Sequence, residues 1–295
     1  MRAWLLASGV FLASSSASAF CRTTVCKPSE SCPPDQHGCP SGQVIAWPRV
    51  CVSYSLQYRA SRQVDLETAT KVVEKAFAAW QEVQCPGSGM PPSIAVAPAR
   101  GTVACTIEEY NQTDGNANII VFRDDNWESE DHEPSALALT TVHYNSKTGD
   151  IYDVDMEING QYRLSTSEMP GDAYDLQSVV THEAGHFLGL AHSEEADATM
   201  YLQYSSGSVA FRDLSDDDIA GICAIYPPER TGVCDFEPRK GFSPECGIYP
   251  TQGGRCSVSR EGTAVHDGAS IGALTCVGLC VGLLGARRRR FPAVR

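Results

Sequence analysis

Two histidines and a glutamate near the middle of the chain have the spacing of a metal site. His182 and His186 are four residues apart, so one turn of a helix places both imidazoles on the same face. Two neutral imidazoles on one face can hold a single Zn²⁺ ion, and Glu183 stays near the metal without having to bind it. We therefore expect Glu183 to act as a general base toward a water at the metal.

A glycine explains how a third ligand arrives. Gly189 can adopt a positive φ angle without a side-chain penalty, so the helix can stop there and the chain can turn sharply. The turn would carry His192 back to the metal. Three protein ligands leave the fourth tetrahedral position to water, which distinguishes a catalytic zinc from a structural one. The alternative is a helix with incidental histidines, or a degenerate and inactive copy of such a site.

A helix must position these ligands, and the surrounding residues predict one. Asp175 is a suitable N-cap, and the residues after it divide into an apolar and a polar side. The apolar side consists of Leu176, Val179, Val180 and Phe187, and the polar side of Gln177, Ser178 and Thr181.

The string His182-Glu183-x-x-His186-x-x-Gly189-x-x-His192 resembles the signature of the metzincin zinc peptidases. Ser193 directly follows the third histidine, as in matrixins, the branch that is similar to matrix metalloproteinases. The resemblance implies a zinc metalloendopeptidase with one catalytic Zn²⁺ and protein or peptide substrates. Its ligands would be the three histidines, and its catalytic base Glu183.

The segment after the histidines resembles the matrixin Met-turn. In the family the methionine, here Met200, lies beneath the metal as an apolar floor, and the tyrosine at Tyr204 helps to wall the substrate pocket. The family usually has proline where this chain has Leu202. Residues 214–226 resemble the final matrixin helix, and Ser215 with Asp218 is a capping signal for it.

The resemblance implies an α+β fold of the metzincin, or zincin-like, type. This fold has a twisted, mostly parallel sheet with an antiparallel edge strand, two long helices and a C-terminal helix. The strand containing Leu137 and Ala138 would border the cleft, where a substrate peptide would bind extended and add its hydrogen bonds to the sheet edge.

Two other functions compete with the peptidase hypothesis. A surface adhesin or binding module could retain zinc without turnover, although a purely structural site does not need a carboxylate at Glu183. Another metzincin branch, such as an astacin-like one, would keep the chemistry. Ser193 and the absence of a tyrosine two residues after Met200 argue against that branch.

Hydrophobic periodicity predicts the remaining elements of the domain. A second helix is expected over residues 65–83, and it should bury the core residues Val72, Val73, Ala76, Phe77 and Trp80. Strands are expected at 50–56, 93–97, 118–122, 137–144 and 152–158.

Composition limits the class of protein. The chain has 295 residues, 42% of them hydrophobic, and a net charge of −13. An acidic protein is a poor partner for nucleic acid or an anionic membrane surface. The chain has 13 cysteines, which indicates an oxidising compartment, and an apolar run before Ala17-Ser18-Ala19 predicts a signal peptide that is cut after Ala19. We therefore expect an exported protein, extracellular or on the cell surface.

The domain organisation follows from these features. We expect a signal peptide over residues 1–19, a Cys-rich segment over 20–49 and a catalytic domain over 50–228. A Cys-containing linker or appendage over 229–268 precedes an apolar tail over 269–295 with four consecutive arginines. The tail could enter a membrane with the arginines on the cytoplasmic side. From Gly253 onward it resembles the sorting tails of myxobacteria-like Gram-negative bacteria, and a plain membrane anchor or a buried apolar helix are the alternatives.

The cysteines suggest specific pairings. Cys85 and Cys105 flank a loop and a predicted strand, so we expect a Cys85–Cys105 disulfide. The Pro-Arg-Cys-Gly type of motif that blocks the zinc in many matrixins is absent. Cys39 could still act as such a switch, but a disulfide role is favoured.

The sequence contains further residues that could bind metal ions. Many matrixins carry a structural zinc, but His132 and His143 do not form the family pattern, so no second zinc is expected. Several aspartates could supply oxygen ligands for Ca²⁺, and solvated acidic turns are the favoured alternative. They are Asp124, Asp125, Asp150, Asp153 and Asp155.

Overall fold

The structure is a computed structural model that describes residues 20–25, 31–34, 39, 41–127, 132–245 and 286–290, the last range by its backbone only. The predicted signal peptide over residues 1–19 and most of the predicted tail lie outside the described residues. Among the described residues, no helix combines the length and the apolar composition that crossing a bilayer requires.

A six-stranded sheet forms the floor of the domain, in the order β10-β6-β7-β5-β3-β4. Strands β4, β3, β5 and β7 are parallel to one another, and β6 runs antiparallel to β7. The predicted mostly parallel sheet with an antiparallel strand is confirmed. The strands are β3 (Cys51–Leu56), β4 (Ala95–Pro98), β5 (Ile119–Arg123), β6 (Ala138–Asn145), β7 (Ile151–Asn159) and β10 (Ala286–Arg290).

Short elements complete the described part of the chain. Two-residue strands pair β1 with β2 and β8 with β9, and β10 pairs antiparallel with residues 141–145 of β6. The elements are β1 (Thr24–Val25), β2 (Gln43–Val44), β8 (Leu164–Ser165), β9 (Tyr174–Asp175) and the 3₁₀ helix η2 (Ala210–Arg212).

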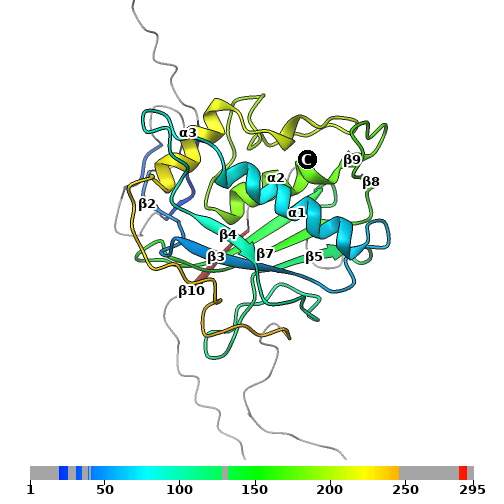
Figure 1. The fold of residues 1–295 in the computed structure, drawn as a ribbon, viewed down its shortest axis with the longest axis horizontal. Coiled ribbons are helices and arrows are strands. Elements are labelled where there is room, and N and C mark those ends of the chain that lie inside the picture. Colours follow the sequence, from blue (N-terminus) through cyan, green and yellow to red (C-terminus); the bar gives the residue numbers. More distant parts are fainter. Residues whose placement is uncertain are drawn as a thin grey trace, which may run out of the picture.

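Helices α1 (Leu66–Gln81) and α2 (Leu176–Phe187) cover one face of this sheet (Figure 1). Asp65 caps α1 by accepting a hydrogen bond from the amide of Thr68 at 2.9 Å. The predicted apolar residues of α1 are all buried, and Phe77 lies 4.9 Å from the ring of Tyr54 on β3. The main core therefore lies between the two helices and the sheet, and its side chains pack against the sheet-facing side of α2.

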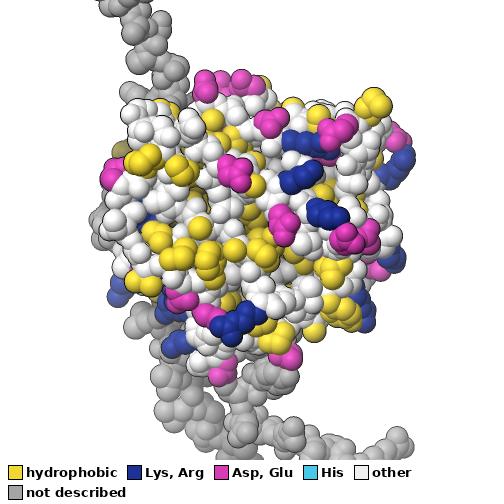
Figure 2. All heavy atoms as spheres, in the orientation of Figure 1, with side chains coloured by type: hydrophobic (Ala, Val, Ile, Leu, Met, Phe, Trp, Pro, Cys, Tyr) yellow, Lys and Arg dark blue, Asp and Glu magenta, His cyan; other side chains and the backbone are white. Residues whose placement is uncertain are grey.

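The surface above α1 is charged and mixed. Acidic and basic side chains lie side by side there, and hydrophobic side chains gather over β4 at the edge of the sheet (Figure 2). On α1 itself the ammonium of Lys71 lies 2.6 Å from the carboxylate of Glu67. Such an exposed pair contributes little to the free energy of unfolding. The face of α1 that points away from α2 is thus an ordinary solvated surface.

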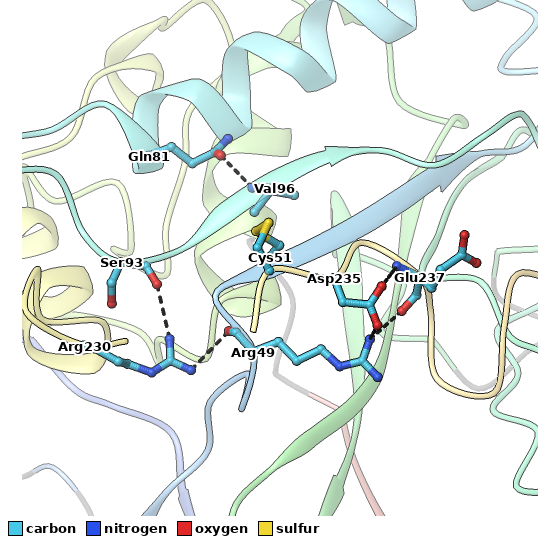
Figure 3. Close-up of a disulfide and its surroundings, with 9 residues drawn as sticks. Arg49, Cys51, Gln81, Ser93, Val96, Arg230, Asp235 and Glu237 are labelled. Carbon is cyan, nitrogen blue, oxygen red and sulfur yellow. Dashed lines mark hydrogen bonds and ion pairs between the residues drawn. A yellow bond between two sulfur atoms is a disulfide. The ribbon is translucent and has the colours of Figure 1, made fainter. Parts of the chain in front are cut away.

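The segment 229–245 lies against the other face of the sheet (Figure 1). The disulfide Cys51–Cys234 attaches it to β3, and the hydroxyl of Ser53 donates a 2.6 Å hydrogen bond to the carbonyl of Phe236. Figure 3 shows Arg49 beside this disulfide, where its guanidinium donates to Asp235 at 3.0 Å. The described part of the predicted linker or appendage, residues 229–245, is therefore attached to the sheet at several points.

The disulfides differ from the predicted pairing. Cys85 is bonded to Cys223 on helix α3 (Asp216–Ile225), so the expected Cys85–Cys105 bridge is wrong. The expectation relied on nearness in sequence, whereas this bridge spans 138 residues. Cys39 is bonded to Cys21, so it has the disulfide role.

The acidic face of β7 is also different from the expectation. Asp153 and Asp155 are fully buried, so they are not solvated turn residues. Asp155 accepts hydrogen bonds from the amides of Glu109 and Ile119, whereas Asp153 has no hydrogen-bond partner among the described residues. Alternating acidic residues are normally read as a solvent face, but here residues 103–117 cover that side of the sheet. Calcium binding by the acidic residues stays a prediction.

Candidate metal centre

Helix α2 carries the first two predicted ligands and begins where the sequence predicts. Asp175 caps it by accepting a 2.8 Å hydrogen bond from the amide of Ser178. The indole of Trp80 on α1 donates to the carbonyl of Thr181 at 2.8 Å. The polar side of the helix, with Ser178 and Thr181, is buried as well as the apolar side, so α2 is a central rather than a surface helix.

The three predicted ligands converge. Ring nitrogens of His182, His186 and His192 all lie within 4.8 Å of one another, and the two Nε2 atoms of His186 and His192 are 3.2 Å apart. This is the only such group of His, Cys, Asp or Glu side chains in the described part of the chain. Three imidazole nitrogens at this separation fit a tetrahedral Zn²⁺ with one remaining position.

Backbone carbonyls select the tautomer of the two helical histidines. Nδ1 of His182 lies 2.6 Å from the carbonyl oxygen of Thr199, and Nδ1 of His186 lies 2.9 Å from that of Leu190. A carbonyl can only accept, so Nδ1 carries the proton in both neutral rings and Nε2 keeps its lone pair. Nε2 of His182 is buried and has no hydrogen-bond partner among the described residues, as a ligand atom requires.

The turn that presents His192 depends on Gly189. Its φ angle is +95°, and a Cβ atom there would collide with the carbonyl oxygen of Ile45. The helix ends as expected, because the amide of Leu190 donates back to the carbonyl of Gly185 at 3.0 Å. His192 follows two residues later.

An N-terminal segment supports the same turn. The amide of Thr23 donates to the carbonyl of Gly189 at 3.0 Å, and the amide of Ala191 donates to the carbonyl of Cys21 at 2.9 Å. The sequence indicates only a Cys-rich segment over residues 20–49, with Cys39 as a disfavoured switch at the metal, and it predicts no backbone contact with this turn. A single pair of strand-like residues gives no periodic signal, so only the three-dimensional pairing reveals this support.

Met200 packs against the ligand helix, and its place beneath the metal stays a prediction. It is buried next to Gly185, where an added Cβ would lie 2.8 Å from the ring of Trp80 and still closer to the sulfur of Met200. Gly185 lies between His182 and His186 on the helix, and its missing side chain lets Met200 and Trp80 pack closely against this part of α2.

Asp218 on α3 fixes the Met-turn. Its carboxylate accepts hydrogen bonds from the amides of Thr199 at 2.7 Å and Met200 at 3.0 Å. Ser215 and Asp218 also form the predicted capping box of α3. Burial raises the pKa of Asp218, and these hydrogen bonds oppose the increase. One side chain thus connects the start of α3 to the carbonyl that orients His182.

Glu183 has the surroundings of a general base. It is fully buried, and Oε2 accepts a 2.6 Å hydrogen bond from the hydroxyl of Thr140 on β6. Oε1 has no hydrogen-bond partner among the described residues. Burial raises the pKa of Glu183 to about 7, and the hydrogen bond from Thr140 works against this increase. A carboxyl that titrates near neutral pH can both take and return a proton.

The ligand histidines are kept neutral. Burial lowers the pKa of His192 to about 4, and it lowers the pKa values of His182 and His186 well below their ordinary range, to which the neighbouring rings also contribute. A histidine must be unprotonated to bind a metal, so the pocket favours the ligand form of all three side chains at neutral pH.

The three residues predicted for the substrate pocket belong to two separate segments of the chain. Leu137 and Ala138 are buried at the start of β6, and Tyr204 is buried with its ring 4.8 Å from that of Phe211 on η2. The ring of Phe211 is in turn 6.1 Å from that of His182. Phe211 was not singled out from the sequence, because a lone aromatic in a polar loop has no distinguishing pattern.

The edge of β6 at Ala138 has no strand partner among the described residues. The amide of Asn159 donates to the carbonyl of Leu137 at 2.9 Å, which makes these two residues a hydrogen-bonded pair of the β6–β7 ladder. In an antiparallel ladder the next residue, Ala138, then directs its amide and carbonyl away from β7. The described residues of β10 pair with Thr141 to Asn145 and do not reach Ala138.

His132 and His143 do not approach the three ligands. His132 lies 3.2 Å from the carboxylate of Glu157, which also pairs with Arg123. Burial would raise the pKa of Glu157, but the hydrogen bond from His132 and the charge of Arg123 outweigh it and lower the pKa. His143 is 3.9 Å from Asp153 on β7. The negative charge of the Glu157 carboxylate is thus compensated by Arg123 and His132.

Comparisons with known proteins agree with this geometry. The model of the matrixin family matches residues 46–227, more than half of the chain. Matrix metalloproteinase-C of Caenorhabditis elegans is 28% identical over 185 residues, which are 61% of this chain and 28% of that protein. Interstitial collagenase of Bos taurus is 53% identical over 67 residues, or 22% of this chain and 14% of that protein. Metalloendoproteinase 1-MMP of Arabidopsis thaliana is 46% identical over 56 residues, or 19% and 15%. The chain thus spans less than a third of the length of each of these three relatives.

Proposed function

Because the chain belongs to the matrixin family of zinc metalloendopeptidases, we propose that it is an exported endopeptidase in which Glu183 is the general base. The zinc ligands in this proposal are His182, His186 and His192. A bound Zn²⁺ supplies a Lewis acid that lowers the pKa of a water molecule and polarises the scissile carbonyl. All other steps are assigned to side chains and backbone groups of the protein.

Glu183 moves the proton. Oε1 accepts a proton from the attacking water, so an O–H bond of the water breaks while the oxygen bonds to the scissile carbon. Glu183 then gives the proton to the leaving nitrogen as the C–N bond breaks. The pKa of about 7 suits both steps, and no covalent bond to the protein forms. The edge of β6 at Ala138, which is unpaired within the described part of the chain, can hold the substrate backbone in an extended form.

One observation supports the catalytic assignment most strongly. Nε2 of His182 and Oε1 of Glu183 are both fully buried, come from adjacent residues of α2 and have no hydrogen-bond partner within the described part of the chain. A structural zinc site has four protein ligands and has no use for a buried free carboxylate oxygen. This argues against the zinc-binding adhesin.

Export is part of the same proposal. The predicted signal peptide and the disulfides Cys21–Cys39, Cys51–Cys234 and Cys85–Cys223 support an oxidising compartment outside the cytoplasm. The proposed destination is the extracellular space or the cell surface of a Gram-negative bacterium, where the C-terminal tail would attach the protein. Mass spectrometry of the mature protein tests this, since a start at Phe20 is expected and an uncut N-terminus would contradict it.

Turnover of a fluorogenic peptide tests the catalytic assignment. Wild type should cleave the peptide, lose activity with a chelator and regain it with Zn²⁺. Glu183→Gln should keep one zinc per chain and lose nearly all turnover, because the amide cannot accept the proton. Full activity in this variant, or a wild type that binds zinc but cleaves no peptide or protein, would refute the proposal.

A further inference from the structure

Thr140 on β6 contacts the proposed base from the opposite side of the core. Its side chain is fully buried and points toward α2, and its hydroxyl oxygen lies 2.6 Å from Oε2 of Glu183. The next nearest acceptor, the carbonyl oxygen of Glu183, is 3.5 Å away. A hydroxyl has one proton to donate, so the short contact identifies the carboxylate as its acceptor.

This hydrogen bond makes the two carboxylate oxygens of Glu183 different from each other. Oε2 is engaged by Thr140, whereas Oε1 has no hydrogen-bond partner among the described residues. A buried carboxylate without such a donor could rotate about its terminal bond, because that torsion is broad. With the donor in place, the rotation would sacrifice a charge-assisted hydrogen bond in a low-dielectric core.

We propose that Thr140 is a positioning residue for catalysis, which holds Oε2 of Glu183 so that Oε1 remains available for the proton. This inference rests on the proposed function, because it assumes that Glu183 is the base. The hydrogen bond can persist through the reaction, because protonation of Oε1 leaves Oε2 a carbonyl-type oxygen that still accepts from the hydroxyl. Thr140 does not touch the substrate in this role.

The neighbouring residue provides a matched control. Thr141 is equally buried on the same strand, but its side chain lies on the other face of the sheet and its hydroxyl has no hydrogen-bond partner among the described residues. Replacing threonine with valine removes the hydroxyl and keeps the branched shape at both positions. The two variants therefore differ mainly in whether a hydrogen bond to Glu183 is lost.

The experiment compares Thr140→Val, Thr140→Ser and Thr141→Val with wild type in the full-length protein. We measure kcat and KM for the fluorogenic peptide, zinc content by mass spectrometry and the urea midpoint of unfolding. Thr140→Val should lower kcat by about tenfold to a hundredfold, as expected for a buried hydrogen bond to a charged group, with KM and zinc content unchanged. Thr140→Ser should restore most of kcat, and Thr141→Val should match wild type.

The outcomes separate this inference from the proposed function. Wild-type kcat in Thr140→Val, combined with an inactive Glu183→Gln, would overturn the positioning role alone. A loss of kcat that serine does not rescue, or one accompanied by loss of zinc, would also overturn it, because packing would then be the cause. An active Glu183→Gln variant would instead refute the assignment of the base.

Discussion

Nδ1 of His182 lies 2.6 Å from the carbonyl oxygen of Thr199, the residue directly before Met200. The amides of both Thr199 and Met200 donate to Asp218 on α3. A ligand on α2 is therefore oriented by a loop that is itself held by another helix. Partners of this kind affect metal affinity although they never touch the metal.

Asp218→Asn should weaken both the fold and the metal site. The asparagine keeps one acceptor oxygen but presents an NH₂ group to amides that already donate, so about 1–3 kcal/mol of the free energy of unfolding should be lost. Zinc affinity should fall about tenfold, because the carbonyl that orients His182 is no longer held. Urea unfolding and competition with a chelator measure the two effects. Asp216→Asn, in the same turn but exposed, is the control, and an equal effect in both variants would contradict the prediction.

Gly185→Ala should strain the contact between α2 and the Met-turn. The new methyl group would lie 2.8 Å from the ring of Trp80 and closer to the sulfur of Met200, so overpacking of about 1–3 kcal/mol is expected. Shortening Met200 to alanine removes part of the collision. In a double-mutant cycle measured by urea unfolding, the combined variant should therefore be less destabilised than the sum of the two single variants. Simple additivity would show that the two residues do not collide.

The disulfide between β3 and the segment 229–245 should contribute much more to the free energy of unfolding than the ion pair beside it. Cys51–Cys234 closes a loop over a sequence separation of 183 residues, so replacing both cysteines with serine should cost about 2–5 kcal/mol. Arg49→Gln removes a half-exposed ion pair to Asp235 and should cost less than about 1 kcal/mol. Urea unfolding of the two variants tests this order, and the reverse order would contradict it.

Asp153 should make the free energy of unfolding depend on pH. Burial raises its pKa well above the ordinary value of 3.8, and the nearby charges of Asp155 and Glu109 add to the increase. A carboxyl whose pKa is higher in the folded state stabilises the fold at low pH, and this contribution is lost as the pH rises through the raised pKa. Asparagine does not titrate.

The free energy of unfolding of wild type, relative to that of Asp153→Asn, should therefore fall as the pH rises above the ordinary carboxyl pKa of 3.8. Urea unfolding at several pH values above this pKa measures the difference. Asp197→Asn, at an exposed position, is the control and should track wild type throughout. A difference between wild type and Asp153→Asn that stays constant with pH would contradict the prediction.

The metal centre could be predicted from the sequence because its parts are close together in the chain. His182, His186 and His192 lie on one helix and the turn after it, and their spacing alone determines that they meet. Helical spacing of apolar residues also identified α1, and short apolar or alternating runs identified the main strands, although β3 and β5 are buried on both faces.

What the sequence did not reveal are contacts between distant segments. The hydrogen bond from Thr140 to Glu183 joins residues 43 positions apart, and the disulfide Cys85–Cys223 joins residues 138 positions apart. Neither leaves a local pattern. The burial of Asp153 was missed for a related reason, because an alternating acidic strand looks the same whether water or residues 103–117 cover it.

The pairing of Cys21 and Thr23 with the turn at Gly189 has a practical consequence for producing this protein. A recombinant fragment trimmed to the family match, from Ala46 to Pro227, would contain every proposed ligand and the proposed base. It would nevertheless lack the two backbone hydrogen bonds that brace the loop in front of His192. Expression boundaries should therefore be set at Phe20 or earlier, and affinity tags should be kept away from that end.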